Sequence, residues 1–134
     1  MKDVNAIIEQ ASDGNYSIFH DADALPYLIT GTGKTIELAK ADFLQGYEDM
    51  KQYCLEHDGE FEEANWHWSY DTATFLRDYA FAFSLAGLSR ITGVNQGILS
   101  HYVNGTSRPS AKTIARIQQG INAFARNLTD MEFV

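Results

Sequence analysis

The spacing of apolar residues divides the chain into segments of different period. In the first half, apolar and polar side chains alternate over short runs, which is the period of a β-strand. Four segments are predicted as strands on this basis or as short apolar runs: residues 4–11, 16–20, 25–30 and 61–70. Asp13-Gly14 predicts a hairpin turn between the first two. Gly31 and Gly33 are expected to end the third strand.

Between the third and fourth predicted strands the period lengthens to three and four residues, which is typical of one face of a helix. The apolar positions are Ile36, Ala39, Phe43, Tyr47, Met50 and Cys54. Thr35 is the expected N-cap and the helix is expected to end near His57, before Gly59. The first half is therefore predicted as a β-β-β-α-β unit.

The second half has no strand pattern and predicts helices only. We expect helices over residues 72–83, 84–92 and 95–103 and a last helix after Ser110. Asn95 and Ser110 are the expected caps, and Asn104-Gly105 is expected to end the third helix. In the first of these we expect Phe75, Leu76, Tyr79, Ala80 and Phe83 to face inward, and in the last Ile114, Ile117, Ile121, Phe124 and Leu128. The predicted fold class is α+β, with an α+β domain over residues 1–71 and an all-α domain over 72–134.

The charge of the chain is segregated in the same way. The formal net charge is −8, but residues 1–71 carry 4 Lys and 15 Asp/Glu, whereas residues 72–134 carry 6 Lys/Arg and 3 Asp/Glu. An acidic first half and a basic second half indicate two modules with different partners.

Residues 84–102 have the features that a helix-turn-helix requires. Such a motif needs a small residue where the two helices cross, a left-handed residue in the turn and apolar side chains from both helices in one core. Ser89 is the small residue and Gly93 is the turn. The predicted core positions are Leu85, Leu88, Val94, Leu99 and Tyr102. We therefore expect this half of the chain to bind DNA.

The stretch LSRITGVNQGILSHYVNGTSRPSAKTIARI resembles the Cro/phage-repressor family of helix-turn-helix domains, and the resemblance covers about 60 residues. It implies that the start of the second helix enters the major groove. Gln96 is then suited to pair with adenine, with Ser100 and His101 next on the outward face. Gly97 departs from a good helix former and costs about 1 kcal/mol of helix stability. The residues expected at DNA are Asn95, Gln96, Gly97, Ser100, His101, Asn104, Ser107 and Arg108. Among them Asn95, Asn104, Ser107 and Arg108 are suited to phosphates.

Because the second half carries few cations, one copy is not expected to bind DNA tightly. We therefore expect a homodimer or a higher homo-oligomer that places two recognition helices roughly 34 Å apart on a palindromic operator.

The stretch YSIFHDADALPYLITGTGKTIELAKADFLQGYEDM is similar to HicB-type antitoxin domains. The counterparts are Leu25-Pro26, Gly31 and the run from Thr35 to Ala39, whereas the acidic and aromatic residues 58–71 have no clear counterpart. The resemblance implies an antitoxin that masks a small basic RNA-cleaving toxin and represses its own operon. Acidic residues suited to that partner are Asp21, Asp23, Glu60, Glu62 and Glu63. The alternative is a one-component regulator whose first domain dimerises or senses a small ligand.

Other chemistry finds little support in the sequence. Gly31-Thr-Gly-Lys-Thr35 ends like a phosphate-binding loop, but the pattern needs a Gly where Leu28 stands. We expect no metal, no cofactor, no catalytic residue and no enzymatic activity. Trp66, Trp68 and Tyr70 are expected on one face of the sheet, where packing is their expected use, and exposure would make them a partner surface. With one cysteine, no signal peptide and no membrane-length apolar run, the expected location is cytoplasmic and away from the membrane.

Overall fold

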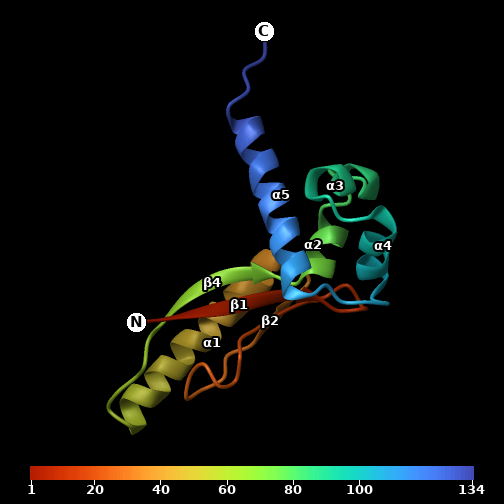
Figure 1. Ribbon diagram of the computed structural model, residues 1–134. Coiled ribbons are helices and arrows are strands. Elements are labelled where there is room, and N and C mark those ends of the chain that lie inside the picture. Colours follow the sequence, from red (N-terminus) through yellow and green to blue (C-terminus); the bar gives the residue numbers. More distant parts are fainter. The chain divides into compact units, whose positions relative to one another are not determined.

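The computed structural model describes all residues from Met1 to Val134 (Figure 1). Contacts along the chain divide it into two compact units, Met1–Asp71 (unit 1) and Thr72–Val134 (unit 2). The division lies where the charge of the sequence changes sign. Unit 1 holds one four-stranded sheet and one long helix, and unit 2 holds four helices, so the protein is of mixed α and β structure.

The sheet of unit 1 has the strand order β3-β2-β1-β4. Its strands are β1 (Lys2–Gln10), β2 (Tyr16–Phe19), β3 (Gly31–Gly33) and β4 (Ala64–Tyr70). β1 pairs with β2 as an antiparallel hairpin, with Ile8 opposite Ile18, and pairs with β4 in parallel, with Val4 opposite Trp66. The hairpin closes at Gly14, whose φ of 89° is the left-handed conformation that glycine adopts without strain.

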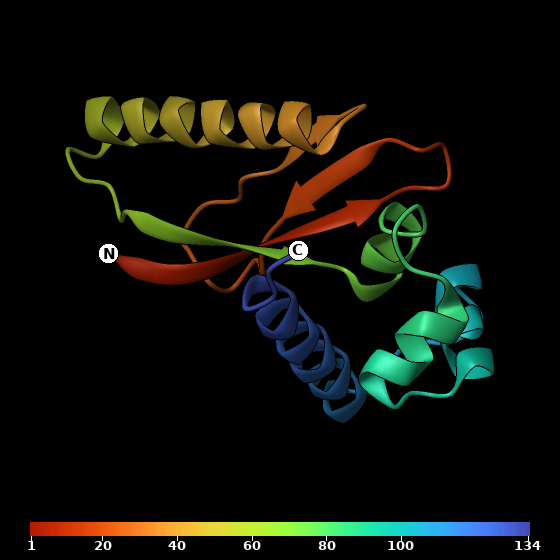
Figure 2. The same ribbon diagram turned by 90° about the horizontal axis from the view of Figure 1, so that it is seen from above.

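Helix α1 (Ile36–His57) lies along one face of this sheet (Figure 2). Thr35 caps it as predicted, since its side chain accepts a hydrogen bond from Leu38 N over 3.1 Å. The apolar face of the helix meets the inward residues of β1 and β2. The buried residues of this core are Ala6, Ile8, Ile18, Ile29, Ala39 and Phe43, with Ile36, Tyr47, Met50 and Trp66 packed against them.

The third strand is not where the sequence predicted it. Residues 25–30 form a loop, and the strand is Gly31–Gly33, which was expected to be its end. The loop is nevertheless apolar because Leu25 and Ile29 are buried. A Cβ on Gly31 would lie 2.6 Å from Phe43 Cβ, and one on Gly33 2.6 Å from Ala39 N. The glycines therefore let an edge strand pass directly beside α1, an arrangement that hydrophobic periodicity does not reveal.

Unit 2 consists of α2 (Thr72–Asp78), α3 (Leu85–Thr92), α4 (Gln96–Asn104) and α5 (Ala111–Thr129). The predicted caps Asn95 and Ser110 each accept hydrogen bonds from backbone N–H groups in the first turn that follows. Ser84, predicted as the first residue of its helix, caps α3 in the same way. The four helices share one core, whose buried residues are Leu76, Leu88, Val94, Leu99, Tyr102 and Ile117. The longest helix of this unit, α5, runs beside α3 (Figure 1).

Two predictions about unit 2 are wrong in detail. The helix expected over residues 72–83 ends at Asp78, and residues 79–82 turn so that Ser84 can take the extended conformation of a cap. Phe83 thus reaches the core from a turn, and Ala80 is exposed rather than buried. On α5, Ile114 and Leu128 are 45% and 51% exposed, because α3 covers only the middle of its apolar face. No helix of either unit has the length and apolarity to cross a membrane.

Candidate nucleic-acid interface

The site begins with the turn between α3 and α4, at residues 93–95. Gly93 has a φ of 74°, the left-handed conformation predicted for the turn. The Thr92 hydroxyl donates to Leu88 O over 2.7 Å and accepts from Val94 N over 3.2 Å, so it links the end of α3 to the turn. Val94 is 3% exposed and fixes the turn to the shared core. The start of α4 is therefore held rigidly relative to α3.

A third support comes from α5. An Arg116 guanidinium nitrogen donates to the carbonyl oxygen of Gly93 over 2.6 Å. Farther along α5, a Cβ on Gly120 would lie 2.6 Å from Ile91 O, so the backbones of α3 and α5 approach closely there. Neither residue was singled out from the sequence. Gly120 lies mid-helix, where glycine is unfavourable, and that position is the signal that could have indicated close packing.

The first turn of α4 is exposed. Asn95 Oδ1 accepts from Gly97 N over 2.8 Å and from Ile98 N over 3.4 Å, so its oxygen is occupied by capping and its amide N–H groups are what it can offer to a ligand. Gln96 is exposed, and Gly97 beside it leaves the backbone accessible. The sequence reasoning missed Ile98, which is 45% exposed on a helix whose other apolar residues mostly face the core.

In the second turn of α4, the two residues predicted to face outward differ in exposure. Ser100 is half-buried, whereas His101 is exposed. The His101 ring Nδ1 lies 2.9 Å from Thr106 Oγ1, and the His101 carbonyl accepts from Thr106 N over 3.0 Å. The ring is therefore held in one orientation, with Nε2 left as its outward nitrogen. Thr106 was also missed, because a contact that closes a loop has no sequence period.

The loop from α4 to α5 brings the remaining predicted residues next to this helix. Asn104 precedes Gly105, whose φ of 74° ends α4, and Ser107 N donates to His101 O over 3.4 Å. Arg108 is exposed, and Ser110 then caps α5 by accepting from Thr113 N over 3.2 Å. Lys112 adds a second exposed cation in the first turn of α5. Exposed N–H groups at a helix start and nearby cations suit an anion such as a phosphate.

The acidic residues predicted to bind a protein partner all lie in unit 1, but they differ in exposure and in whether they are paired. Asp21, Asp23, Glu60 and Glu62 are exposed. Asp21 Oδ1 accepts from Asp23 N over 3.0 Å, which shapes their loop. Glu63 is instead paired with Lys51, whose Nζ lies 2.6 Å from Glu63 Oε1. The hydrogen bond and the charge of Lys51 hold the pKa of Glu63 below its ordinary value, and Glu63 is less available to a partner than its neighbours.

Glu60 and Glu62 also line a cavity of about 480 Å³ at the end of α1. Its other lining residues are Pro26, Tyr27, Cys54, Asp58 and Phe61. Tyr27 stacks on Phe61 with ring centroids 4.9 Å apart, and its hydroxyl donates to Glu62 O over 2.7 Å. Burial is the main reason that the pKa of Tyr27 is raised from its ordinary 10.0, with the charges of Tyr47 and Glu62 adding to it. The cavity thus combines aromatic walls with three carboxylates.

The aromatic residues of β4 divide between core and surface. Trp66 packs edge-on against Phe43, with centroids 4.8 Å apart, in the core of unit 1. Trp68 is 37% exposed and carries Lys40 Nζ 4.9 Å from its ring centroid, and Tyr70 is also exposed. Trp68 also meets Phe43 edge-on, with ring centroids 5.8 Å apart, so packing is the role of Trp66 and in part of Trp68, whereas Tyr70 contributes surface. No three His, Cys, Asp or Glu side chains are grouped to hold a metal ion.

Comparison with known proteins gives no further guide to this site. No model of a known protein family matches the chain, and neither the curated proteins nor the solved structures contain a significant match.

Proposed function

We propose that unit 2 binds double-stranded DNA through α4 and that the protein is a sequence-specific transcriptional repressor. The observation that carries this proposal is the start of α4: it follows a turn fixed by Thr92, Val94 and Arg116, yet its own first turn is exposed. A protruding helix end on a rigid support is the geometry with which such motifs enter the major groove.

The exposed side chains suit distinct parts of a duplex. Gln96 can accept and donate to the N6/N7 edge of adenine, and Ile98 can contact a thymine methyl group. Arg108, Lys112 and the N–H groups that begin α5 suit backbone phosphates. The small number of base-reading side chains, with Gly97 among them, favours a dimer that reads two half-sites over a monomer that reads one.

The DNA proposal is tested by selection from a random 20-bp duplex library with the full chain, followed by fluorescence anisotropy on the enriched duplex. We expect binding that weakens linearly on a log–log plot as salt rises, together with a two-fold symmetric enriched sequence. Binding with no salt dependence, or no enrichment over the starting library, would overturn the proposal.

For unit 1 we propose a basic protein partner, as expected of an antitoxin. The observation that favours it is the cavity at the end of α1, in which Asp58, Glu60 and Glu62 stand beside the rings of Tyr27 and Phe61. Carboxylates next to an aromatic face are suited to the guanidinium or ammonium group of an Arg or Lys side chain. A basic RNA-cleaving toxin offers such side chains.

The same cavity also supports the alternative of a ligand-sensing regulator, because its volume of about 480 Å³ is enough for a small molecule. Co-expression with the product of a small basic neighbouring gene distinguishes the two. We expect co-purification and loss of the toxic effect, and we expect the double variant Glu60→Gln/Glu62→Gln to weaken both. A protein that purifies alone, and whose DNA affinity responds to a small molecule, would favour the regulator instead.

A further inference from the structure

A second hollow lies in unit 2, away from the exposed start of α4. It has a volume of about 740 Å³ and is lined by Ala82, Phe83, Ser84, Gly87, Arg90, Ile91, Phe124 and Leu128. Two of these residues, Phe83 and Phe124, meet edge to face with ring centroids 5.9 Å apart. Leu128 is 51% exposed, so the chain does not fill this hollow with its own residues. The hollow is apolar with a single cation, Arg90, and is called the α3/α5 groove below.

The last five residues have the complementary character. Helix α5 ends at Thr129, and residues 130–134, which we call the tail, continue beyond it (Figure 1). Phe133 is 98% exposed and Met131 is 58% exposed. Between them stands Glu132, and Asp130 precedes them, so the tail holds two of the three acidic residues of unit 2. The tail is therefore both apolar and acidic.

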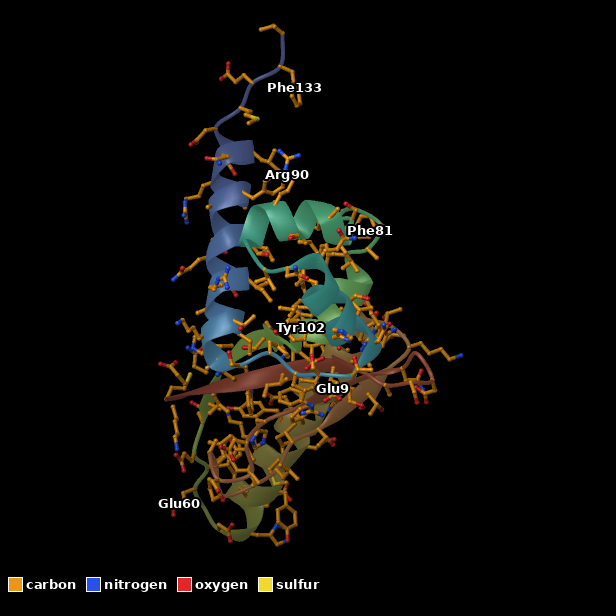
Figure 3. The ribbon with its side chains drawn as sticks, turned by 45° about the vertical axis from the view of Figure 1, so that its right-hand side comes forward. Glu9, Glu60, Phe81, Arg90, Tyr102 and Phe133 are labelled. Carbon is orange, nitrogen blue, oxygen red and sulfur yellow. The ribbon has the colours of Figure 1, made fainter.

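We propose that two copies of the protein exchange their tails, each placing Phe133 in the α3/α5 groove of the other with Glu132 beside Arg90. The argument is complementarity of shape and charge: the groove offers an aromatic floor and a cation, and the tail offers an aromatic ring next to a carboxylate. Figure 3 shows Arg90 at the junction of α3 and α5, and Phe133 on the tail beyond the end of α5.

The backbone favours exchange over folding back onto the same molecule. Asp130 N donates to Arg126 O and Met131 N donates to Leu128 O, so the chain keeps following the helix end through Met131. To enter the groove of its own molecule, which begins beside Leu128, the chain would have to reverse direction in the step from Met131 to Phe133. Exchange about a two-fold axis covers both grooves and both tails at once, as an isologous interface requires.

Tail exchange would supply the interface of the dimer proposed for DNA binding, and in this respect it rests on the proposed function. Because it is tested without DNA, its failure would leave the DNA proposal standing. Sedimentation velocity on the full chain, at 50 mM salt, compares Arg90→Glu, Glu132→Arg and the double variant. We expect each single variant to weaken dimerisation about tenfold or more, because it places like charges together, and the double variant to restore it. Lys112→Glu, a cation of α5 outside the groove, is the matched control and should dimerise as the wild type does.

Equal dimerisation in all variants, or a double variant as weak as the singles, would overturn the proposal. Circular dichroism on each variant separates a lost interface from a lost fold. Cross-linking then distinguishes exchange from folding back: in a Cys54→Ser background, Ala82→Cys and Val134→Cys are combined and oxidised. A disulfide-linked dimer is the expected product, whereas a linked monomer or no link at all contradicts tail exchange.

Discussion

Arg116 on α5 donates a hydrogen bond to the carbonyl oxygen of Gly93 over 2.6 Å, although 23 residues separate the two. The bond joins the supporting helix to the left-handed residue on which the direction of α4 depends. A carbonyl in a turn is otherwise left to water, so this contact makes Arg116 a support of the proposed DNA site rather than one of the residues proposed to contact DNA. The chemistry of α4 therefore depends on a residue that lies outside the two helices of the motif.

Replacing Arg116 by Ala should loosen the turn. We expect a loss of about 1 kcal/mol from the missing hydrogen bond. Hydrogen exchange followed by mass spectrometry should show faster exchange over residues 92–99, together with weaker DNA binding. Arg126→Ala, at an exposed arginine in the last turn of the same helix, is the control and should change neither. Unaltered exchange in Arg116→Ala would mean that the turn is held without this bond.

Gly120 marks a close contact that a methyl group should break. Alanine is the better helix former by about 1 kcal/mol, so an exposed site would gain stability from the change. Here the new Cβ would lie 2.6 Å from Ile91 O and 2.8 Å from Thr92 Cα, both backbone atoms that cannot rotate away. We therefore expect Gly120→Ala to lower the free energy of unfolding by about 1–3 kcal/mol, as overpacking does.

The matched control for this change is Gly46→Ala on α1. Its new Cβ would lie 3.7 Å from Ile29 Cγ2, which is ordinary van der Waals contact, so we expect no loss or a gain of up to about 1 kcal/mol. Thermal unfolding followed by far-UV circular dichroism measures both. A Gly120→Ala protein as stable as Gly46→Ala would show that α3 and α5 can separate at little cost.

Comparison of sequence and structure shows which features local chemistry encodes. Thr35, Asn95 and Ser110 were predicted as caps and act as caps, because capping depends on one side chain and the N–H groups two or three residues on. Ser84, predicted as the first residue of its helix, is its cap instead. Gly93 and Gly105 were likewise predicted as turn or terminating residues and have positive φ. These are interactions of short range in the chain.

The features that the sequence did not predict depend on distant contacts. β3 was misplaced because Gly31 and Gly33 serve the approach of a helix, and that helix follows them in the chain. Residues 25–30 are held as a loop in part by His20, whose Nε2 accepts from Ile29 N over 3.0 Å. Thr106 and Arg116 act through partners 5 and 23 residues away. Periodicity contains no information on such pairs, and their roles emerge only from the packed structure.

Base and phosphate contacts should be distinguishable by mutation. Gln96→Ala removes a group suited to adenine, and we expect it to cost about 1–3 kcal/mol on the enriched duplex and little on a scrambled one. Arg108→Ala should instead weaken binding to both duplexes and reduce the slope of log affinity against log salt by about 1. Anisotropy titrations at four salt concentrations measure both effects. A Gln96→Ala variant that lost the same affinity on the scrambled duplex as on the enriched one would show that Gln96 does not read sequence.

Because of Tyr27, the stability of unit 1 should depend on pH in the alkaline range. Its folded-state pKa is raised above the ordinary 10.0, so the neutral hydroxyl is favoured by folding. The stabilisation is complete below pH 10 and is lost as the pH rises further, because the unfolded chain then ionises first. Tyr27→Phe lacks this group and the 2.7 Å bond to Glu62 O, so it should be less stable by about 1 kcal/mol at pH 8. The difference from the wild type should shrink between pH 10 and 11.

Urea unfolding followed by tryptophan fluorescence measures this dependence for unit 1 alone, since both tryptophans, Trp66 and Trp68, lie there. Tyr53→Phe, at a tyrosine that is 57% exposed on α1, is the matched control and should follow the wild type across the pH range. If Tyr27→Phe and wild type instead lost stability in parallel above pH 10, the Tyr27 hydroxyl would be ionising as freely in the folded protein as in the unfolded chain. The closed wall that it forms with Phe61 and Glu62 would then be open to solvent, and the cavity would be a poorer site for the cationic side chain proposed to occupy it.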